Sequence, residues 1–240
     1  MKIDVIQRNR EFEKSSAVAL LQWALKEFSP KIALASSFGA EDVALIDILM
    51  KLDPKIRVFT LDTGRLNEET YEVMDKVRRR YGITIEAYFP DKAAVQKLER
   101  DKGFYSFRES VENRKECCGI RKVEPLARAL KGLDAWITGL RRSQSMTRTG
   151  VNKIEADETH AGLVKINPLA DWSEQDVWNY IKKNQVPYNR LHDMGYPSIG
   201  CAPCTRAVKP GEDIRSGRWW WENPDHRECG IHESRPKKSP

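Results

Sequence analysis

The sequence predicts an α/β fold, a Rossmann-like, mostly parallel sheet with helices on both faces, followed by an irregular C-terminal segment. Two observations support this prediction. Short apolar runs alternate with helix-like runs between residues 31 and 183, and regular periodicity stops after residue 186. Strands separated by helices of about 10–15 residues imply right-handed βαβ crossovers. We therefore expect an α/β domain over 1–186 and a site-forming segment over 187–240 within the same domain.

The first half of the chain supplies three of the predicted βα units. Residues 31–36 form a short apolar run that ends in a glycine-containing turn, and 41–52 have the apolar content of a largely buried helix. The next strand covers 56–61. Asn67 caps the helix that follows it, with acidic residues in its first turn and arginines in its last. A third strand and a short helix are predicted at 83–89 and 91–100.

The second half continues the alternation. A helix is predicted to open at Cys118 and to run to about residue 130, before a strand at 134–139. A fifth strand is predicted at 163–169. Ser173 with Asp176 three residues later is a capping pattern, which predicts a helix through about residue 183.

Composition excludes several classes of protein. The 240 residues are 40% hydrophobic and 32% charged, which is typical of a globular chain, and the net charge of +6 favours an anionic partner. No apolar run approaches the roughly 20 residues of a membrane span, and the N-terminus lacks the apolar core of a secretion signal. Five cysteines without an export signal indicate a reduced, cytoplasmic setting.

Three polar loops follow predicted strands, at 36–42, 62–65 and 139–145. Ligands bind at the carboxyl ends of parallel strands, so these loops are expected to converge on one edge of the sheet. The first loop combines hydroxyls, a glycine and a helix start, which suits a phosphate, although an ordinary strand–helix turn is the alternative. It lacks the Walker pattern and is more similar to the serine-rich loop of enzymes that bind adenylates.

Residues 140–154 contain four cations and no acidic residue, namely Arg141, Arg142, Arg148 and Lys153. Most such runs are solvated loops. Because this one follows a strand, it is interpreted as a lid whose guanidinium groups bind a phosphate or sulfate.

Four cysteines are arranged as an adjacent pair and a C-x-x-C, at Cys117, Cys118, Cys201 and Cys204. Adjacent Cα atoms are only about 3.8 Å apart, so a single tetrahedral zinc is awkward. In a [4Fe–4S] cluster each thiolate binds its own iron, which favours an iron–sulfur site. Zinc, a strained vicinal disulfide and unliganded buried thiols remain the alternatives.

Cys229 is left over, close to cations and three residues before His232. Positive charge favours the thiolate, so Cys229 is a candidate nucleophile on a mobile arm, although many lone thiols near a terminus are inert. The triplet 219–221 of tryptophans is interpreted as a packing anchor. Arg215 and Arg218, three residues apart, could face a phosphate together.

Eight segments together resemble the assimilatory adenylyl-sulfate reductases, the iron–sulfur members of the phosphoadenylyl-sulfate reductase family. They occur in the same order between about residues 30 and 233. These segments are 37–42 (SFGAED), 61–65 (LDTGR), 116–122 (ECCGIRK), 138–142 (TGLRR), 171–178 (DWSEQDVW), 200–206 (GCAPCTR), 217–222 (GRWWWE) and 228–232 (ECGIH).

The resemblance implies a fold of the adenine-nucleotide-binding type and an enzyme that reduces adenylyl sulfate to sulfite and AMP with thioredoxin, for cysteine biosynthesis. Cys229 would attack the sulfate sulfur and carry the sulfite as an S-sulfonate. A [4Fe–4S] cluster would be held by the four remaining cysteines and would tune electrostatics and structure. The implied substrate-binding residues are Ser36, Ser37, Gly39, Glu41, Leu61, Gly64, Lys122, Arg142, Arg148, Arg215, Arg218 and His232.

Two departures from the family pattern concern the loops. The loop reads SSFG at 36–39, where many relatives have SFSG, and the lid at 145–148 differs slightly in length, so the position of Arg148 could be shifted by one residue. The oligomeric state is left open, a homo-oligomer included.

Other functions make different predictions. A reductase of the 3′-phosphorylated substrate, or of both substrates, is the alternative enzyme, but its specific members usually lack the cysteine quartet. A metal-stabilised RNA-binding module is disfavoured because the charge is only modestly basic and the aromatics are not interleaved with cations, so nucleic acid is not an expected partner. An adenylating thiolation enzyme would need a loop richer in glycine.

Overall fold

The computed structural model describes residues 3–145, 148–160 and 162–223. The chain is divided into two compact units. The first unit comprises the described residues up to 60 together with 68–86 and 132–190. The second comprises 61–67, 87–131 and the described residues from 191 onward. The sequence-based division at residue 186 stays a prediction.

A six-stranded sheet has the strand order β3-β2-β1-β4-β6-β5. Its pairs β1–β2, β1–β4 and β4–β6 are parallel, whereas β5 runs antiparallel to β6. The predicted fold class, a mostly parallel Rossmann-like sheet, is therefore confirmed. The strands are β1 (Ile32–Ala35), β2 (Arg57–Leu61), β3 (Ile85–Tyr88), β4 (Ala135–Ile137), β5 (Ile154–Asp157) and β6 (Leu163–Ile166).

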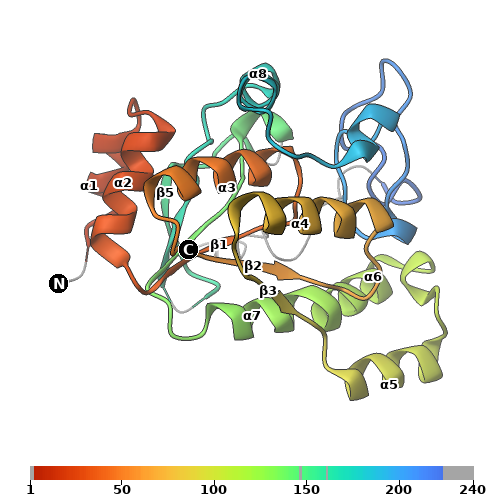
Figure 1. The fold of residues 1–240 in the computed structure, drawn as a ribbon. Helices are drawn as coiled ribbons and strands as arrows, with labels where there is room; N and C mark the ends of the chain where they lie inside the picture. Colours follow the sequence, from red (N-terminus) through yellow and green to blue (C-terminus); the bar gives the residue numbers. More distant parts are fainter. Residues whose placement is uncertain (1–2, 146–147, 161, 224–240) are drawn as a thin grey trace. The chain divides into compact units, whose positions relative to one another are not determined.

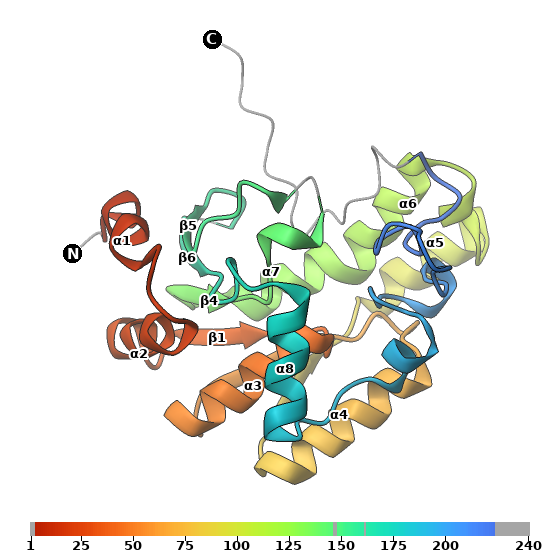
Figure 2. The same ribbon diagram turned by 90° about the horizontal axis from the view of Figure 1, so that it is seen from above.

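Among the described residues, five α-helices belong to the first unit, and their caps explain where several begin. The Ser16 hydroxyl accepts a hydrogen bond from the Ala19 backbone, and Ser173 with Asp176 forms the predicted capping box. In Figure 1, α3, α4 and α8 lie on the same side of the sheet, and Figure 2 shows α8 lying over α3. The helices are α1 (Val5–Phe12), α2 (Ala17–Phe28), α3 (Ala40–Leu52), α4 (Glu68–Tyr81) and α8 (Glu174–Asn184).

The core of the first unit surrounds β1 and α3. Side chains on all sides of α3 are buried, so this helix is not amphipathic. Asp47 on this helix is buried and accepts hydrogen bonds from the hydroxyls of Tyr81 on α4 (2.8 Å) and Tyr180 on α8 (2.6 Å). These bonds join the three helices to one another.

The second unit contains the cysteine-bearing elements. They are α5 (Lys92–Lys102), the 3₁₀ turns Ser106–Arg108 and Ala202–Cys204, α6 (Val111–Cys118), a π-helical turn (Gly119–Val123) and α7 (Glu124–Leu130). The prediction that a helix opens at Cys118 was wrong. The helix begins at Val111 because the Ser110 hydroxyl accepts from the Asn113 backbone (3.1 Å), so the cysteine pair lies at its C-terminal end. A hydrophobic cluster around Leu98 and Phe107 includes Cys117.

In the part of the chain that the structure describes, none of the helices combines the length and the apolar character that a membrane span requires.

Candidate active site

The loop between β1 and α3 is held by its own side chains. The Ser36 hydroxyl accepts from the Phe38 backbone N–H (3.1 Å), and Phe38 is fully buried in the left-handed conformation, with φ of 59°. A non-glycine residue in this region is uncommon and is retained only where its surroundings hold it. The predicted loop residues Ser36, Ser37, Gly39 and Glu41 therefore belong to one fixed turn at the carboxyl end of β1.

Asp42 is the charged group inside this turn. Its Oδ2 accepts from both the backbone N–H (2.6 Å) and the hydroxyl (2.7 Å) of Ser37. Burial is the largest influence on this carboxyl and raises its pKa to about 6, although the hydrogen bonds from Ser37 act in the opposite direction. The Asp42 carboxylate therefore holds the loop in its conformation through the two hydrogen bonds from Ser37.

The loop after β4 lies against the start of α3. Arg141 is buried and binds Glu41 through Nε and Nη2, both 2.8 Å from Oε1. A Cβ at Gly139 would lie 2.3 Å from Asp42 Oδ1 and 2.9 Å from Glu41 Cβ, so only glycine fits there. Two of the three loops predicted to converge, 36–42 and 139–145, are in contact within the first unit.

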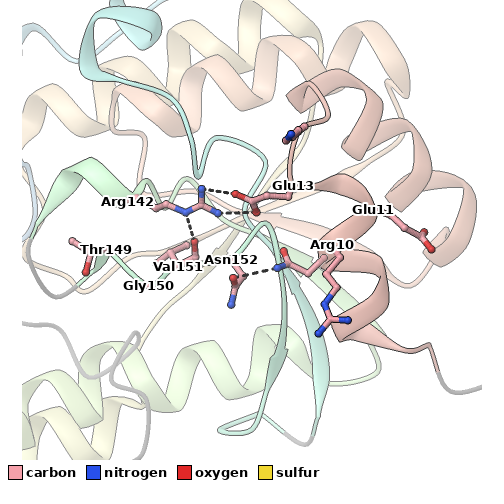
Figure 3. Close-up of a pocket in the computed structure, with 10 residues that line it drawn as sticks. Arg10, Glu11, Glu13, Arg142, Thr149, Gly150, Val151 and Asn152 are labelled. Atoms are coloured by element: carbon pink, nitrogen blue, oxygen red, sulfur yellow. Dashed lines mark hydrogen bonds and ion pairs between the residues drawn. The ribbon is translucent and has the colours of Figure 1, made fainter.

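The arginines of the predicted lid, Arg142 and Arg148, bind other residues of the protein. Arg142 donates to the Val151 carbonyl (2.7 Å) and forms a bidentate ion pair with Glu13, at 2.7 and 3.0 Å (Figure 3). Arg148 donates to the Gln144 amide oxygen (2.6 Å). Arg142 also lines an open cavity of about 560 Å³, between the segment before α2 and residues 149–152. Met146 and Thr147, between the two arginines, lie outside the described residues.

The loop after β2 belongs to the second unit, where it meets the C-x-x-C segment. Gly64 has φ of +69° and its N–H donates to Asp62 Oδ1 (2.9 Å), a turn that suits glycine. The Thr63 hydroxyl lies 3.2 Å from Cys201 Sγ, and the Arg65 carbonyl accepts from the Ala202 N–H (2.8 Å). These contacts fix the C-x-x-C segment to the chain that follows Leu61.

The four predicted metal ligands line one small cavity of about 20 Å³. All four are free thiols, and Cys117 and Cys201 are buried. The cavity brings together two cysteine pairs that are far apart in sequence. Its other lining residues include five cations, Arg65, Arg114, Arg121, Lys122 and Arg218.

Electrostatics at the cysteines combine burial with this positive charge. Burial and, to a lesser extent, the neighbouring Cys201 raise the pKa of the Cys204 thiol to about 12, although Lys122 and Arg218 act to lower it. Burial also raises the pKa of Cys117, while Arg65 and Arg121 oppose the shift. A metal centre would favour the thiolates far more strongly than these side chains do, because a coordinating thiol is deprotonated outright.

Two buried contacts join the cysteine-bearing segments. Arg114, on α6, binds Glu222 through two hydrogen bonds of 3.0 Å. The guanidinium groups of Arg114 and Arg218 both lie over the ring of Trp219, at 4.9 and 4.7 Å from its centroid. The backbone N–H of Trp219 donates to the Cys204 carbonyl (3.2 Å). Within the second unit this tryptophan is a packing residue.

The donor set suits a thiolate-bound cluster. Four thiols converge on a cavity that holds no carboxylate among its lining residues. Among the described residues, the buried Nε atoms of Arg121 and Arg218, both lining residues, have no hydrogen-bond partner. Buried donors of this kind suit an inorganic sulfide or an oxyanion. The described side chains do not include three or more His, Cys, Asp or Glu already arranged as ligands of a single ion.

Several predicted residues remain to be located. Cys229 and His232 lie outside the described residues. Arg215 lies before the tryptophan triplet, and its backbone N–H donates to Asp213 Oδ1 (2.8 Å). Lys122 lies in the π-helical turn directly after the cysteine pair.

Sequence reasoning did not single out Arg114, Arg121, Glu222 or Thr63, which all contact the cysteine-bearing segments. Asp42 was read only as part of a loop. A signal was present for Arg114, because it lies three and four residues before the cysteine pair, on the same face of a helix. No local pattern marks Glu222 as its partner.

Comparison with known proteins agrees with this geometry. The phosphoadenosine phosphosulfate reductase domain model matches residues 31–207. The adenosine 5′-phosphosulfate reductase of Allochromatium vinosum is 52% identical over 219 residues, covering 91% of this chain and 85% of that protein. The enzyme of the same name from Burkholderia cepacia is 54% identical over 202 residues, covering 84% and 80%.

A plant relative and two solved structures extend the comparison. The chloroplastic 5′-adenylylsulfate reductase 3 of Arabidopsis thaliana is 48% identical over 99% of this chain, which spans only 54% of that longer protein. Phosphoadenylyl-sulfate (PAPS) reductase of Candida auris, solved as a phosphate complex, is 30% identical with a TM-score of 0.74, covering 87% of this chain and 99% of that one. FMN adenylyltransferase of Candida glabrata, 14% identical with a TM-score of 0.56 and coverage of 95% and 77%, shares the fold.

The resemblance drawn from the eight sequence segments is thus confirmed over most of the chain. With the family model matching residues 31–207 and bacterial relatives above 50% identity, the chain belongs to the phosphoadenosine phosphosulfate reductase domain family of oxidoreductases.

Proposed function

We propose that the chain reduces adenylyl sulfate to sulfite and AMP, with thioredoxin as the reductant, in sulfate assimilation in the cytoplasm. The observation that carries the proposal is the cavity at which two distant cysteine pairs and five cations meet. The names of the bacterial relatives, adenosine 5′-phosphosulfate reductases, point to the same substrate.

Cys117, Cys118, Cys201 and Cys204 would hold a [4Fe–4S] cluster. Four thiolates and a carboxylate-free lining are the donor chemistry that such a cluster takes. When bound, the cluster would supply rigidity and fixed charge to the cavity. The thiols of Cys117 and Cys204, with pKa values raised by burial, would bind as thiolates.

The substrate would be bound by two kinds of residue. The turn at 36–41 would contact the adenylate through Ser36, Ser37, Gly39 and Glu41, with Leu61 and Gly64 as a second wall. Cations would bind the phosphate and sulfate oxygens, because guanidinium groups can pair with two oxygens at once. For Arg142 this requires an exchange of the Glu13 carboxylate for an oxyanion of the substrate. The proposed cations are Lys122, Arg142, Arg148, Arg215 and Arg218, with His232 alongside Cys229.

The proposed chemistry uses two sulfur exchanges. The Cys229 thiolate attacks the sulfate sulfur of adenylyl sulfate, forming an S–S bond while the S–O bond to AMP breaks and AMP leaves. A thioredoxin thiolate then attacks Cys229 Sγ and releases sulfite. The second thioredoxin thiol resolves the mixed disulfide and returns Cys229 as a thiolate, so the dithiol loses the two electrons that the sulfate gains.

Steady-state assays test the proposal. Protein purified anaerobically should contain iron and sulfide, and should release sulfite from adenylyl sulfate in the presence of reduced thioredoxin. The 3′-phosphorylated compound should be a poorer substrate by kcat/KM. A preference for that compound, the substrate class of the Candida auris neighbour, would reassign the substrate. Absence of sulfite from both would overturn the reductase.

A further inference from the structure

Asp42 is a buried carboxylate that the proposed chemistry does not use. It lies in the first turn of α3, three residues after the N-cap Gly39, which has no side chain of its own to cap the helix. Its exposed fraction is 7%, and carboxylates are rarely buried unless they are paired or hydrogen-bonded. No cation is paired with Asp42 by a salt bridge among the described side chains.

The contacts of Asp42 are all to the loop that it closes. Oδ2 accepts from the N–H and the hydroxyl of Ser37, at 2.6 and 2.7 Å. Backbone N–H groups at the start of a helix normally attract an external anion. Here the carboxylate of Asp42 already binds the backbone N–H of Ser37, just before the helix. A phosphate of a bound nucleotide therefore gains nothing from this donor.

The loop after β4 encloses Asp42 from the other side. Its Oδ1 lies 2.3 Å from the place that a Cβ of residue 139 would take, and Arg141 from this loop is bound to Glu41, the neighbour of Asp42. The charged neighbour of Asp42 on α3 is Glu41, which is bound by Arg141 from the loop after β4, and the 36–39 turn contributes no titratable side chain. Ser37 and the loop after β4 fix the position of the Asp42 carboxylate, and the described side chains do not pair it with a cation.

We propose that Asp42 is a positioning residue for nucleotide binding: it fixes the backbone of residues 36–39 in the conformation that contacts the nucleoside, without touching the nucleotide itself. This inference rests on the proposed function, because it assumes that the turn binds an adenylate.

The burial of Asp42 has a cost that supports this assignment. Burial, and to a lesser extent Glu41, raises the pKa of Asp42 to about 6. A residue kept only for stability would favour its ionised form, as Asp47 does on the same helix. Burial opposes ionisation of Asp47 too, but hydrogen bonds from Lys51, Tyr180 and Tyr81 outweigh it and lower its pKa. The hydrogen bonds of Asp42 do not outweigh its burial. A buried carboxylate of this kind is typical of functional sites.

Binding of adenosine and AMP by titration calorimetry tests the proposal. Adenosine is included because it has no phosphate that titrates between pH 5 and 8. Asp42→Ala should weaken the binding of both ligands by the same factor, about tenfold, because the backbone N–H and the hydroxyl of Ser37 lose the acceptor that fixes the turn. Asp42→Asn should weaken both by about threefold, because a neutral acceptor makes weaker hydrogen bonds than a carboxylate.

The pH profile separates positioning from a general structural role. Wild-type affinity for adenosine should fall by about the same threefold as the pH drops through about 6, as Asp42 becomes protonated, and Asp42→Asn should show no such dependence. Asp47→Asn is the matched control, a buried carboxylate on the same helix that also binds hydroxyls, and it should leave both affinities within twofold.

Three outcomes would overturn the inference: unchanged adenosine affinity in Asp42→Ala, a pH dependence that persists in Asp42→Asn, or an equal loss in Asp47→Asn. These results are distinguishable from failure of the proposed function. A wild-type protein that releases sulfite from adenylyl sulfate but whose Asp42 variants bind normally refutes only the role of Asp42. A wild-type protein that binds no adenosine or AMP refutes the nucleotide site itself.

Discussion

Arg114 and Glu222 form a bidentate ion pair, with both hydrogen bonds at 3.0 Å and side-chain exposures of only 1% and 3%. Arg114 lies on α6, one turn before the Cys117–Cys118 pair, and Glu222 follows the tryptophan triplet. Because Trp219 stacks on Arg114 and hydrogen-bonds the Cys204 carbonyl, the pair links the two cysteine-bearing segments. This link therefore helps to bring the four thiols to one cavity.

Removing one partner of this pair should destabilise the protein strongly. Arg114→Ala removes the buried cation that binds the Glu222 carboxylate, which costs about 3–5 kcal/mol of unfolding free energy. Urea denaturation with iron analysis measures the effect, and iron content should fall with stability.

The matched control is Arg128→Ala. Arg128 makes a bidentate pair with Glu124 of similar geometry, at 2.7 and 3.0 Å, but both side chains are nearly half exposed. That loss should cost about 0.5 kcal/mol. Equal effects of the two substitutions would show that the buried pair has no special role.

Asp42→Asn should raise stability at neutral pH while it weakens nucleotide binding. The folded-state pKa of Asp42 is raised from 3.8 to about 6, so the native state binds more protons than the unfolded state between these values. Stability is therefore lost as pH rises through this window, by about 3 kcal/mol, and remains lost above it. In denaturant titrations, the free energy of unfolding of the variant should exceed that of the wild type at pH 8 but not at pH 4.

The opposite sign is expected for Asp47→Asn. The pKa of Asp47 is lowered, so its ionised form contributes stability that is present above the unfolded-state pKa. This variant should be less stable than the wild type at pH 8. If both variants shift stability in the same direction at pH 8, the assignment of a costly charge at Asp42 is wrong.

Glu13→Gln tests whether Arg142 binds the substrate. The carboxylate of Glu13 holds the guanidinium in a partly exposed pair, which is worth up to about 1 kcal/mol (Figure 3). If an oxyanion of the substrate replaces Glu13, removing this competitor should lower the KM for adenylyl sulfate by up to about fivefold. Glu11→Gln, in the same cavity but paired with Arg8, is the control and should leave KM unchanged. A KM that stays constant or rises in Glu13→Gln would make Arg142 a structural residue.

Substitutions of two cysteines should have separable effects. Cys201→Ser should lose iron and destabilise the second unit, because Cys201 lines the cavity and contacts Thr63. Cys229→Ser should retain the iron, the brown colour and the AMP affinity but release no sulfite. Anaerobic iron analysis, calorimetry and sulfite assays on both variants measure this. Loss of the chromophore in Cys229→Ser would show that ligand and nucleophile had been confused.

The fold was largely predictable because the parallel strands are short, buried apolar runs. The segment 31–36 becomes β1, and the Ser173 cap opens α8 as expected. β5 escaped prediction because the sequence of Ile154–Asp157 is half polar, and its strand conformation depends on antiparallel pairing with β6. The cysteine helix was misplaced because the cap Ser110 was overlooked, and that error moved the pair from the start of a helix to its end.

The site residues that form short sequence motifs could be predicted. Those that depend on ion pairs between distant residues could not. The grouping of four cysteines followed from spacing, and the structure brings them to one cavity. The partners Arg142–Glu13 and Arg114–Glu222 are separated by more than 100 residues, and only tertiary packing selects them. Nor could the burial of Asp42 be read from a loop rich in polar residues.

The most direct test of the proposed function is the intact mass of the protein after mixing with adenylyl sulfate in the absence of reductant. The proposal predicts a covalent gain equal to one SO₃ group, mapped to the peptide that contains Cys229, released as sulfite by reduced thioredoxin and absent in Cys229→Ser. Sulfite formation without such an adduct, or an adduct on Cys117, Cys118, Cys201 or Cys204 instead, would contradict it.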